Sequence, residues 1–254
     1  MSHLSVARPL VELCVEGVDG AIAAEAGGAD RVELCASLLE GGITPGIGVV
    51  ARTLDRLSIP VHVIVRPRGG DFHYSEEEFA AMGEELRALA RMGVPGAVIG
   101  CLLPEGVIDE DRMARLVEAA GPMSVTCHRA FDMTRDPEEA VEALIRVGVA
   151  RVLTSGQRDS AAEGLPILRR TIAAAGDRLV VMVCGGLDET NIARIASETG
   201  AAEFHFSAPS TGPSAMVYRN PHVGMGGTAL SREYELTVTD PEAVARTIAA
   251  LRGA

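Results

Sequence analysis

Eight short apolar runs recur along the chain, and each is followed by a polar turn and then by a helical pattern. They begin near residues 10, 31, 61, 96, 123, 151, 179 and 202. The spacing is about thirty residues, the length of one strand–helix unit. A chain built from such units forms a parallel sheet, because each helix carries the chain back to the same end of the sheet.

The intervening helices have recognisable start and stop signals. Ser75 with Glu78 forms a capping box, and Asp136 precedes Pro137 as an N-cap residue before a first-turn proline. Glycines such as Gly148 follow the helical stretches, where a helix commonly ends. The alternation of strands and helices is therefore predicted from two independent signals.

Eight units in 254 residues fit a closed (β/α)8 TIM barrel, and we predict a single barrel domain over residues 1–254. The alternative, an open doubly wound sheet, favours a GxGxxG turn after the first strand, and VEGVDGAI lacks that pattern. A long Gly/Ser/Pro-rich excursion at 207–237 precedes a last helix at about 240–251. Excursions of this length are usually lids, binding loops or subunit contacts.

Composition narrows the partners and the compartment. The net charge of −12 argues against nucleic acid or an anionic membrane as a binding partner, because proteins bind both through patches of Lys and Arg. No apolar run approaches the ~20 residues of a membrane span, and MSHLSVARPLVELC has no signal-peptide pattern. The five cysteines are an odd number without a close-set framework. We expect free thiols and a cytoplasmic location.

In such barrels the functional groups lie at the carboxyl ends of the strands. The first two strands both contain the sequence VELC, at 11–14 and 32–35. Side chains alternate along a strand, and the outer face packs on helices, so the aliphatic residues are expected to face outward. Glu12 and Glu33 then point into the barrel, and Cys14 and Cys35 lie one layer above them at its mouth.

Two neighbouring thiolates are ligands for a soft metal ion. Cu(I) is the better candidate, since structural zinc requires four ligands and Cu(I) tolerates fewer. Two alternatives remain for Cys14 and Cys35: ordinary buried packing, and a disulfide, which a reducing compartment disfavours. We interpret Cys101, Cys127 and Cys184 as structural, with Cys127 facing the helices.

Two groups of charged residues follow the third and fifth strands. His128, Arg129 and Asp132 in CHRAFD are candidates for acid–base or anion-binding roles. Arg66 and Arg68 in RPRGGDF suit an oxyanion or phosphate clamp, because guanidinium groups bind such anions with two hydrogen bonds. The alternative interpretation is that these two arginines neutralise the glutamates inside the barrel.

Small and polar residues follow the last three strands. Ser155 lies in TSGQ, Gly185 and Gly186 lie in CGGL, and His205 and Ser207 end the eighth strand. The loops after strands seven and eight commonly bind phosphate in this fold. These five residues are therefore further anion-binding candidates.

Several blocks of the sequence together resemble the CutC copper-homeostasis family. They are the double VELC segment with ASLLEGGITP, VIVRPRGGDFHYSEEEF, HRAFDMTRDPEEA, VLTSGQ, EGLP and EFHFSA, in order from residue 10 to about 240. The resemblance implies a cytoplasmic barrel associated with copper tolerance, with Cys14 and Cys35 at the positions proposed for Cu(I). It also implies a homo-oligomer, a dimer or higher.

Three functional hypotheses remain open. The first is a copper-homeostasis protein that binds Cu(I) through Cys14 and Cys35. The second is an enzyme acting on a small anionic or phosphorylated substrate, with Glu12, Glu33, His128 or Asp132 as acid or base. The third is a scaffold whose excursion at 207–237 mediates assembly.

Overall fold

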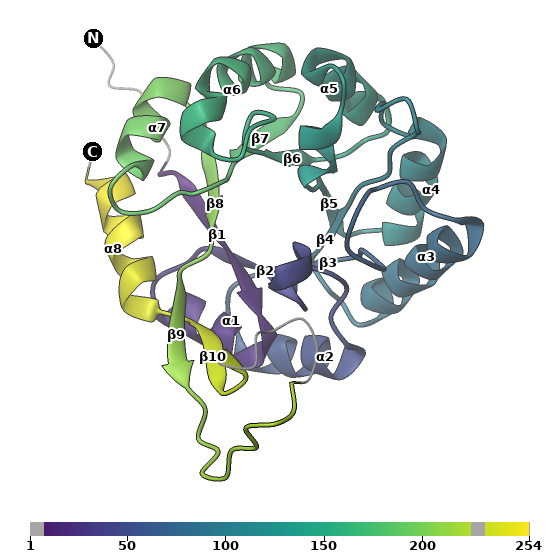
Figure 1. Ribbon diagram of the computed structural model, residues 1–254. Helices are drawn as coiled ribbons and strands as arrows, with labels where there is room; N and C mark the ends of the chain where they lie inside the picture. The colour runs from purple at the N-terminus through teal and green to yellow at the C-terminus, as the bar shows by residue number, and fades with distance from the viewer. Residues whose placement is uncertain (1–7, 225–231, 254) are drawn as a thin grey trace.

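The computed structural model describes residues 8–224 and 232–253, and its eight parallel strands close into a barrel surrounded by helices (Figure 1). The strands are β1 (Leu10–Glu16), β2 (Arg31–Cys35), β3 (Val61–Ile64), β4 (Gly96–Ile99), β5 (Ser124–Cys127), β6 (Arg151–Thr154), β7 (Val180–Val183) and β8 (Glu203–Phe206). The helices are α1 (Gly17–Ala26), α2 (Ile47–Arg56), α3 (Glu76–Arg91), α4 (Glu110–Ala120), α5 (Pro137–Arg146), α6 (Ala161–Ala175), α7 (Ile192–Thr199) and α8 (Pro241–Arg252). The predicted (β/α)8 architecture is confirmed.

The local signals act as the sequence predicts. At the start of α3 the Ser75 hydroxyl accepts a hydrogen bond from the Glu78 amide at 3.2 Å, and the Glu78 carboxylate accepts one from the Ser75 amide at 2.8 Å. The Asp136 carboxylate accepts from two amides at the start of α5. Each cap satisfies amides that the first helical turn leaves unpaired.

The outward face of each strand packs against the helices and forms the main hydrophobic core. In β1 this face consists of Val11, Leu13 and Val15, which are fully buried. Cys101 and Cys127 belong to the same apolar layer. The aliphatic half of the repeated VELC sequence is thus explained by packing between strands and helices.

The inward face of the lower barrel is charged, whereas the usual filling is branched aliphatic side chains. Arg31 of β2 lies between two glutamates: it forms an ion pair with Glu12 and another with Glu203 at 2.7 Å. Arg151 of β6 also pairs with Glu203, at 3.1 Å. Buried ion pairs therefore join β2 to its neighbour β1, and they also join strands that are not adjacent in the barrel, β2 to β8 and β6 to β8.

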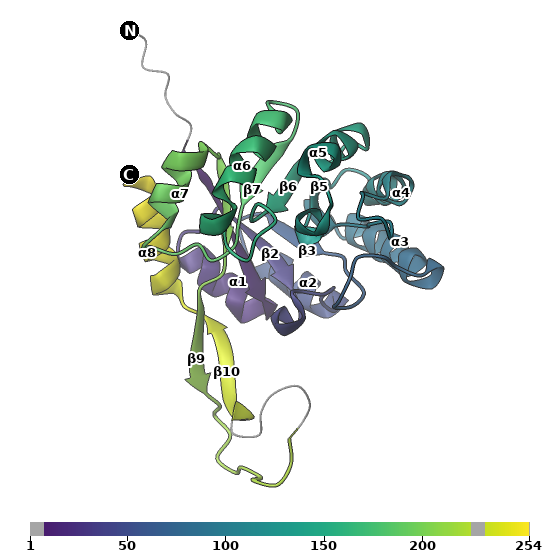
Figure 2. The same ribbon diagram turned by 45° about the horizontal axis from the view of Figure 1, so that its top comes forward.

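The excursion before the last helix contains an antiparallel hairpin that the sequence does not predict. Strands β9 (Pro209–Pro213) and β10 (Glu235–Thr239) pair with each other and extend away from the barrel (Figure 2). We call β9, β10 and the described residues between them the arm. Val217 and Val238 are among its exposed apolar side chains. Residues 225–231 of the predicted excursion lie outside the described part of the chain.

None of the helices in the described ranges combines the length and the apolar character needed to cross a membrane.

Removing the central arginine of the ion-pair network is expected to destabilise the barrel. Arg31→Ala leaves Glu12 and Glu203 buried without this partner, and breaking a buried pair in this way costs about 3–5 kcal/mol. The free energy of unfolding from urea denaturation measures the loss. The control is Arg178→Ala, which removes an exposed pair with Glu142 and should leave the urea midpoint nearly unchanged. Equal effects of the two substitutions would contradict the assigned role of the network.

Candidate functional site

The two VELC cysteines lie together at the carboxyl ends of β1 and β2. Their sulfur atoms are 3.7 Å apart, Cys14 half-buried and Cys35 buried. The strand register pairs Cys14 with Glu33 and Glu16 with Cys35. The cysteines are thus offset by one inward-facing layer and do not share the single layer expected from the sequence. Cys14 and Glu33 occupy one level, with Cys35 above them.

This arrangement can hold one metal ion. One ligand atom each from Cys14, Glu33 and Cys35 lies within 4.8 Å of the other two. The two sulfurs are 3.7 Å apart, so Cys14 and Cys35 would hold one soft ion together, with Glu33 within reach as a third donor.

A histidine links the cysteines to the charged interior. His205 Nδ1 lies 2.8 Å from a Glu12 oxygen, and its Nε2 lies 3.6 Å from a Glu33 oxygen. Burial disfavours the imidazolium, but hydrogen bonds to Cys14 and Glu12 outweigh burial and raise the pKa of His205 well above its usual value. Burial likewise opposes ionisation of Glu12, yet His205 and Arg31 lower its pKa. His205 and Glu12 therefore form a charged pair.

The same contacts give the two thiols different acidities. The hydrogen bond from Cys35 lowers the pKa of Cys14 to about 5, against the effect of burial and with help from His205. That hydrogen bond and burial raise the pKa of Cys35 well above its usual value. At neutral pH the site therefore holds one thiolate and one thiol that donates to it.

A cavity of about 340 Å³ opens above these groups and brings most of the predicted site residues together. The predicted residues in its lining are Cys14, Glu33, Arg66, His128, Arg129, Gly185, Gly186, His205 and Ser207. Phe72 and Cys184 also line it. The volume lies in the range of small-molecule sites. Glu12 lies deeper and reaches the cavity only through His205.

Arg68, Asp132 and Ser155 are not part of this lining. Arg68 is partly exposed and pairs with Glu78 at 2.7 Å, outside the barrel. The Asp132 carboxylate accepts hydrogen bonds from the Thr154 hydroxyl and from the amides of Ser155 and Gln157. Asp132 thus fastens the loop after β6.

Arg66 does not neutralise the glutamates either, because its two Nη atoms donate to the carbonyls of Glu40, Gly42 and Gly70. Arg31 supplies the cation to Glu12, and His205 faces Glu33. The interpretation that Arg66 and Arg68 neutralise the glutamates is therefore wrong. The physical reason is that β3 ends at Ile64, so both arginines lie in a loop.

Sequence reasoning missed the lower layer of the network, which consists of Arg31, His62, Arg151 and Glu203. A signal was available: Arg31 lies two residues before Glu33, and Glu203 lies two before His205, so each shares an inward face with a predicted site residue. The His62 ring has room inside the barrel because Gly96 of β4, which faces it, has no side chain. A Cβ at Gly96 would come within 2.2 Å of the His62 ring.

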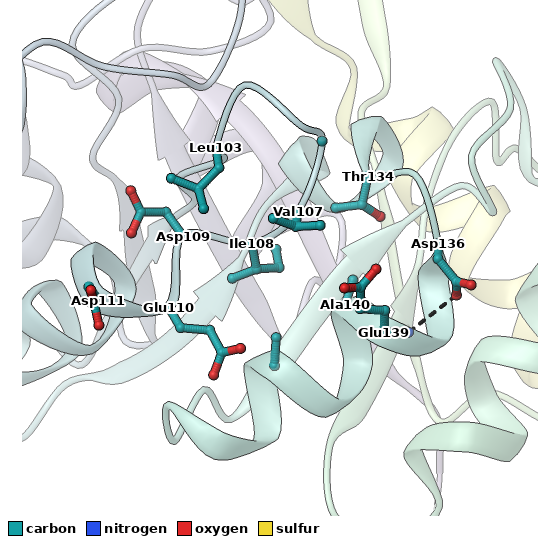
Figure 3. A pocket seen from close by; sticks show the side chains of 12 residues that line it. Leu103, Val107, Ile108, Asp109, Glu110, Asp111, Thr134, Asp136, Glu139 and Ala140 are labelled. Atoms are coloured by element: carbon teal, nitrogen blue, oxygen red, sulfur yellow. Dashed lines mark hydrogen bonds between the residues drawn. The ribbon is translucent and has the colours of Figure 1, made fainter.

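A second hollow of about 460 Å³ lies outside the barrel, at the starts of α4 and α5 (Figure 3). Four of its five carboxylates have partners. Asp109 and Asp136 cap the two helices, and Glu110 and Glu139 pair with arginines. These acidic groups are accounted for by helix capping and surface ion pairs.

The fold and the site together define a (β/α)8 barrel with two thiols at the carboxyl-terminal mouth. The CutC family model matches residues 9–210. A CutC family protein of Mesorhizobium japonicum is 62% identical over 244 residues, covering 96% of this chain and 95% of that protein. The human copper homeostasis protein cutC homolog is 48% identical over 231 residues, covering 91% of this chain and 85% of the relative. The chain belongs to the CutC family.

Solved structures agree with this assignment. The putative copper homeostasis protein CutC of Streptococcus agalactiae superposes with a TM-score of 0.75 at 29% identity, covering 78% of this chain and 98% of that chain. Phosphoribosylanthranilate isomerase of Pyrococcus furiosus superposes with a TM-score of 0.55 at 14% identity, covering 97% of this chain and 100% of that chain. The second likeness shows the barrel fold alone.

The unequal acidities of the thiols predict selective alkylation. Because the pKa of Cys14 is about 5, its reaction with iodoacetamide should be nearly independent of pH above neutrality and should fall as the pH drops through about 5. Removing the imidazolium with His205→Asn raises the pKa of Cys14, so the fall moves to higher pH. Mass spectrometry of the modified peptide gives the rate.

The control for this variant is His222→Asn on the arm, which should leave the Cys14 profile unchanged. A wild-type rate that keeps rising up to pH 9, as for an ordinary thiol, would contradict the assignment.

Proposed function

We propose that the protein is a cytoplasmic copper-homeostasis protein that binds Cu(I) between Cys14 and Cys35. The observation that supports this function is the 3.7 Å separation of the two sulfur atoms at the mouth of the barrel. Cys14 lines the cavity, and the buried Cys35 lies beside it, 3.7 Å away sulfur to sulfur. The two donors therefore need little reorganisation to meet one ion.

The chemistry of the donors favours copper over harder ions. Thiolate sulfur prefers soft ions such as Cu(I), whereas Mg²⁺ and Ca²⁺ take oxygen ligands. The structure supplies two sulfurs and the carboxyl group of Glu33 within reach. Structural zinc sites are normally closed by four protein ligands. Relatives named for copper homeostasis, such as the human homologue, support the same ion.

The site requires reduced cysteines, and both are free thiols in the structure. A cytoplasm keeps thiols reduced. We therefore place the protein in that compartment.

Copper binding is tested by titrating Cu(I) under strictly reducing conditions against a chromophoric Cu(I) chelator. The wild-type protein is expected to withdraw about one equivalent of Cu(I), in keeping with a single pair of soft ligands. The double variant Cys14→Ala, Cys35→Ala should withdraw none. A parallel titration with Zn(II) measures the preference between the two ions.

The matched control is Cys101→Ala, which removes a buried thiol away from the cavity. It should bind as the wild type does. Undiminished Cu(I) binding by the double variant would refute the copper assignment. A higher affinity of the wild-type protein for Zn(II) than for Cu(I) would refute it as well.

The enzyme hypothesis has one observation in its favour. The cavity wall that contains Arg66 and His128 takes no part in the thiol site, and a metal carrier has no evident use for it. A small anionic or phosphorylated substrate therefore stays a candidate. Glu33 faces the same cavity and is the acid–base group nearest the thiols.

The arm supports assembly into a homo-oligomer, a dimer or higher. Val217 is 98% exposed and Val238 is 49% exposed. Apolar side chains gathered on a projecting hairpin commonly mark a contact with another protein chain. A second copy of this chain is the partner we assign to it.

The oligomer is tested by light scattering coupled to size-exclusion chromatography. Val217→Asp combined with Val238→Asp introduces charge into the expected contact and should lower the mass to that of the monomer. Met133→Asp alters an exposed apolar residue elsewhere and should leave the mass unchanged. A monomeric wild-type protein would rule out the assembly.

A further inference from the structure

The guanidinium of Arg66 is a buried cation without a counterion. The residue is only 5% exposed, and within the described ranges no carboxylate oxygen lies within 4.0 Å of its nitrogens. Its Nη atoms donate to three backbone carbonyls, which satisfy hydrogen bonds but carry no net charge. A buried charge that is hydrogen-bonded but unpaired is costly, and an anion beside it removes that cost.

His128 presents a second unsatisfied group on the same wall. Its Nδ1 accepts a hydrogen bond from the Ala130 amide at 3.2 Å, so a neutral ring carries its proton on Nε2. That Nε2 is buried and has no partner in the part of the chain that the structure describes. Burial, and then Arg66, lower the pKa of His128 to about 3, which keeps the ring neutral and Nε2 a donor.

The two groups belong to one built surface. The Arg66 guanidinium lies over the Phe72 ring at 4.9 Å from its centroid, and the His128 ring centroid lies 4.9 Å from that of Phe72. All three side chains line the cavity of about 340 Å³ that also contains Cys14. The position of His128 depends on Gly100, since a Cβ there would come within 2.5 Å of the imidazole.

We propose that the cavity wall formed by Arg66, Phe72 and His128 binds the oxyanion group, a carboxylate or a phosphate, of a small molecule. The oxyanion supplies the negative charge that Arg66 lacks and accepts the free hydrogen bond of His128. Phe72 covers the apolar part of the ligand. Arg129 is already paired with Asp132 and adds positive charge at the rim only.

The site goes beyond copper binding, because none of its three residues is a candidate metal ligand. Both sites open into one cavity, so a small acid bound on this wall would extend toward Cys14 and Glu33. The cavity therefore accommodates an organic anion whose opposite end faces the thiols.

Calorimetric titration of the full chain with inorganic phosphate, and separately with acetate, tests the proposal. Ionic strength is held constant with chloride so that general screening does not change. At least one of the two anions should bind the wild-type protein, and the preferred anion identifies the chemical class. Arg66→Gln and His128→Leu should each weaken binding by about tenfold or more, as expected for loss of a hydrogen bond to a charged group.

Arg68→Gln is the matched control, because it removes a neighbouring arginine that does not line the cavity, and its affinity should equal that of the wild type. The double variant Cys14→Ala, Cys35→Ala should keep anion binding, at wild-type affinity or tighter because the Cys14 thiolate in the same cavity is removed, while it loses copper; this separates the two sites. If Arg66→Gln fails to fold, the wild-type protein supplies the test instead. The NMR signal of its His128 Nε2–H must then shift when phosphate or acetate is added.

Absence of binding by either anion to the wild type, or equal affinity of Arg66→Gln, His128→Leu and Arg68→Gln, would overturn the proposal. So would an unmoved His128 signal in the wild-type titration.

Discussion

The ion pairs of Arg31 are the interaction on which the rest of the site depends. Arg31 joins Glu12 of β1 to Glu203 of β8 across the inside of the barrel. Desolvating charges is costly, and only good pairing offsets that cost. The pairing holds Glu12 ionised, and ionised Glu12 in turn holds the His205 ring, which lies beside Cys14. The hydrogen bond from Cys35 is the main cause of the low pKa of Cys14, and the His205 ring that Glu12 holds in place from the layer below lowers that pKa further.

The mouth of the barrel contains groups of opposite character on its two walls. One wall offers the Cys14 thiolate and the Glu33 carboxyl group, with the buried thiol of Cys35 beside Cys14, and this set of donors suits a soft ion. The other wall offers Arg66 and the free Nε2–H of His128, which suit an oxyanion. Gly100 leaves room for the His128 ring and so keeps that wall in place. The two walls face one space, but each depends on different residues.

Sequence alternation predicted the fold and the facing of the VELC residues, because a closed barrel requires its aliphatic face to meet the helices. The strand starts at residues 10, 31 and 61 were also predicted. Alternation could not give the offset between Cys14 and Cys35, since register between strands depends on how the closed barrel is staggered. It failed beyond the end of β3, where Arg68 turns outward. The β9–β10 hairpin was missed because β9 (PSTGP) has no strand signal, although β10 (ELTVT) has the β-branched residues typical of a strand.

The central claim is that the two sulfurs at the mouth bind one copper ion. The most direct test is a crystal structure of the protein loaded with Cu(I) under reducing conditions, with anomalous diffraction measured at the copper edge. We expect one dominant anomalous peak between the sulfur atoms of Cys14 and Cys35. A dominant peak at any other residue, with these two sulfurs free of metal, would contradict it.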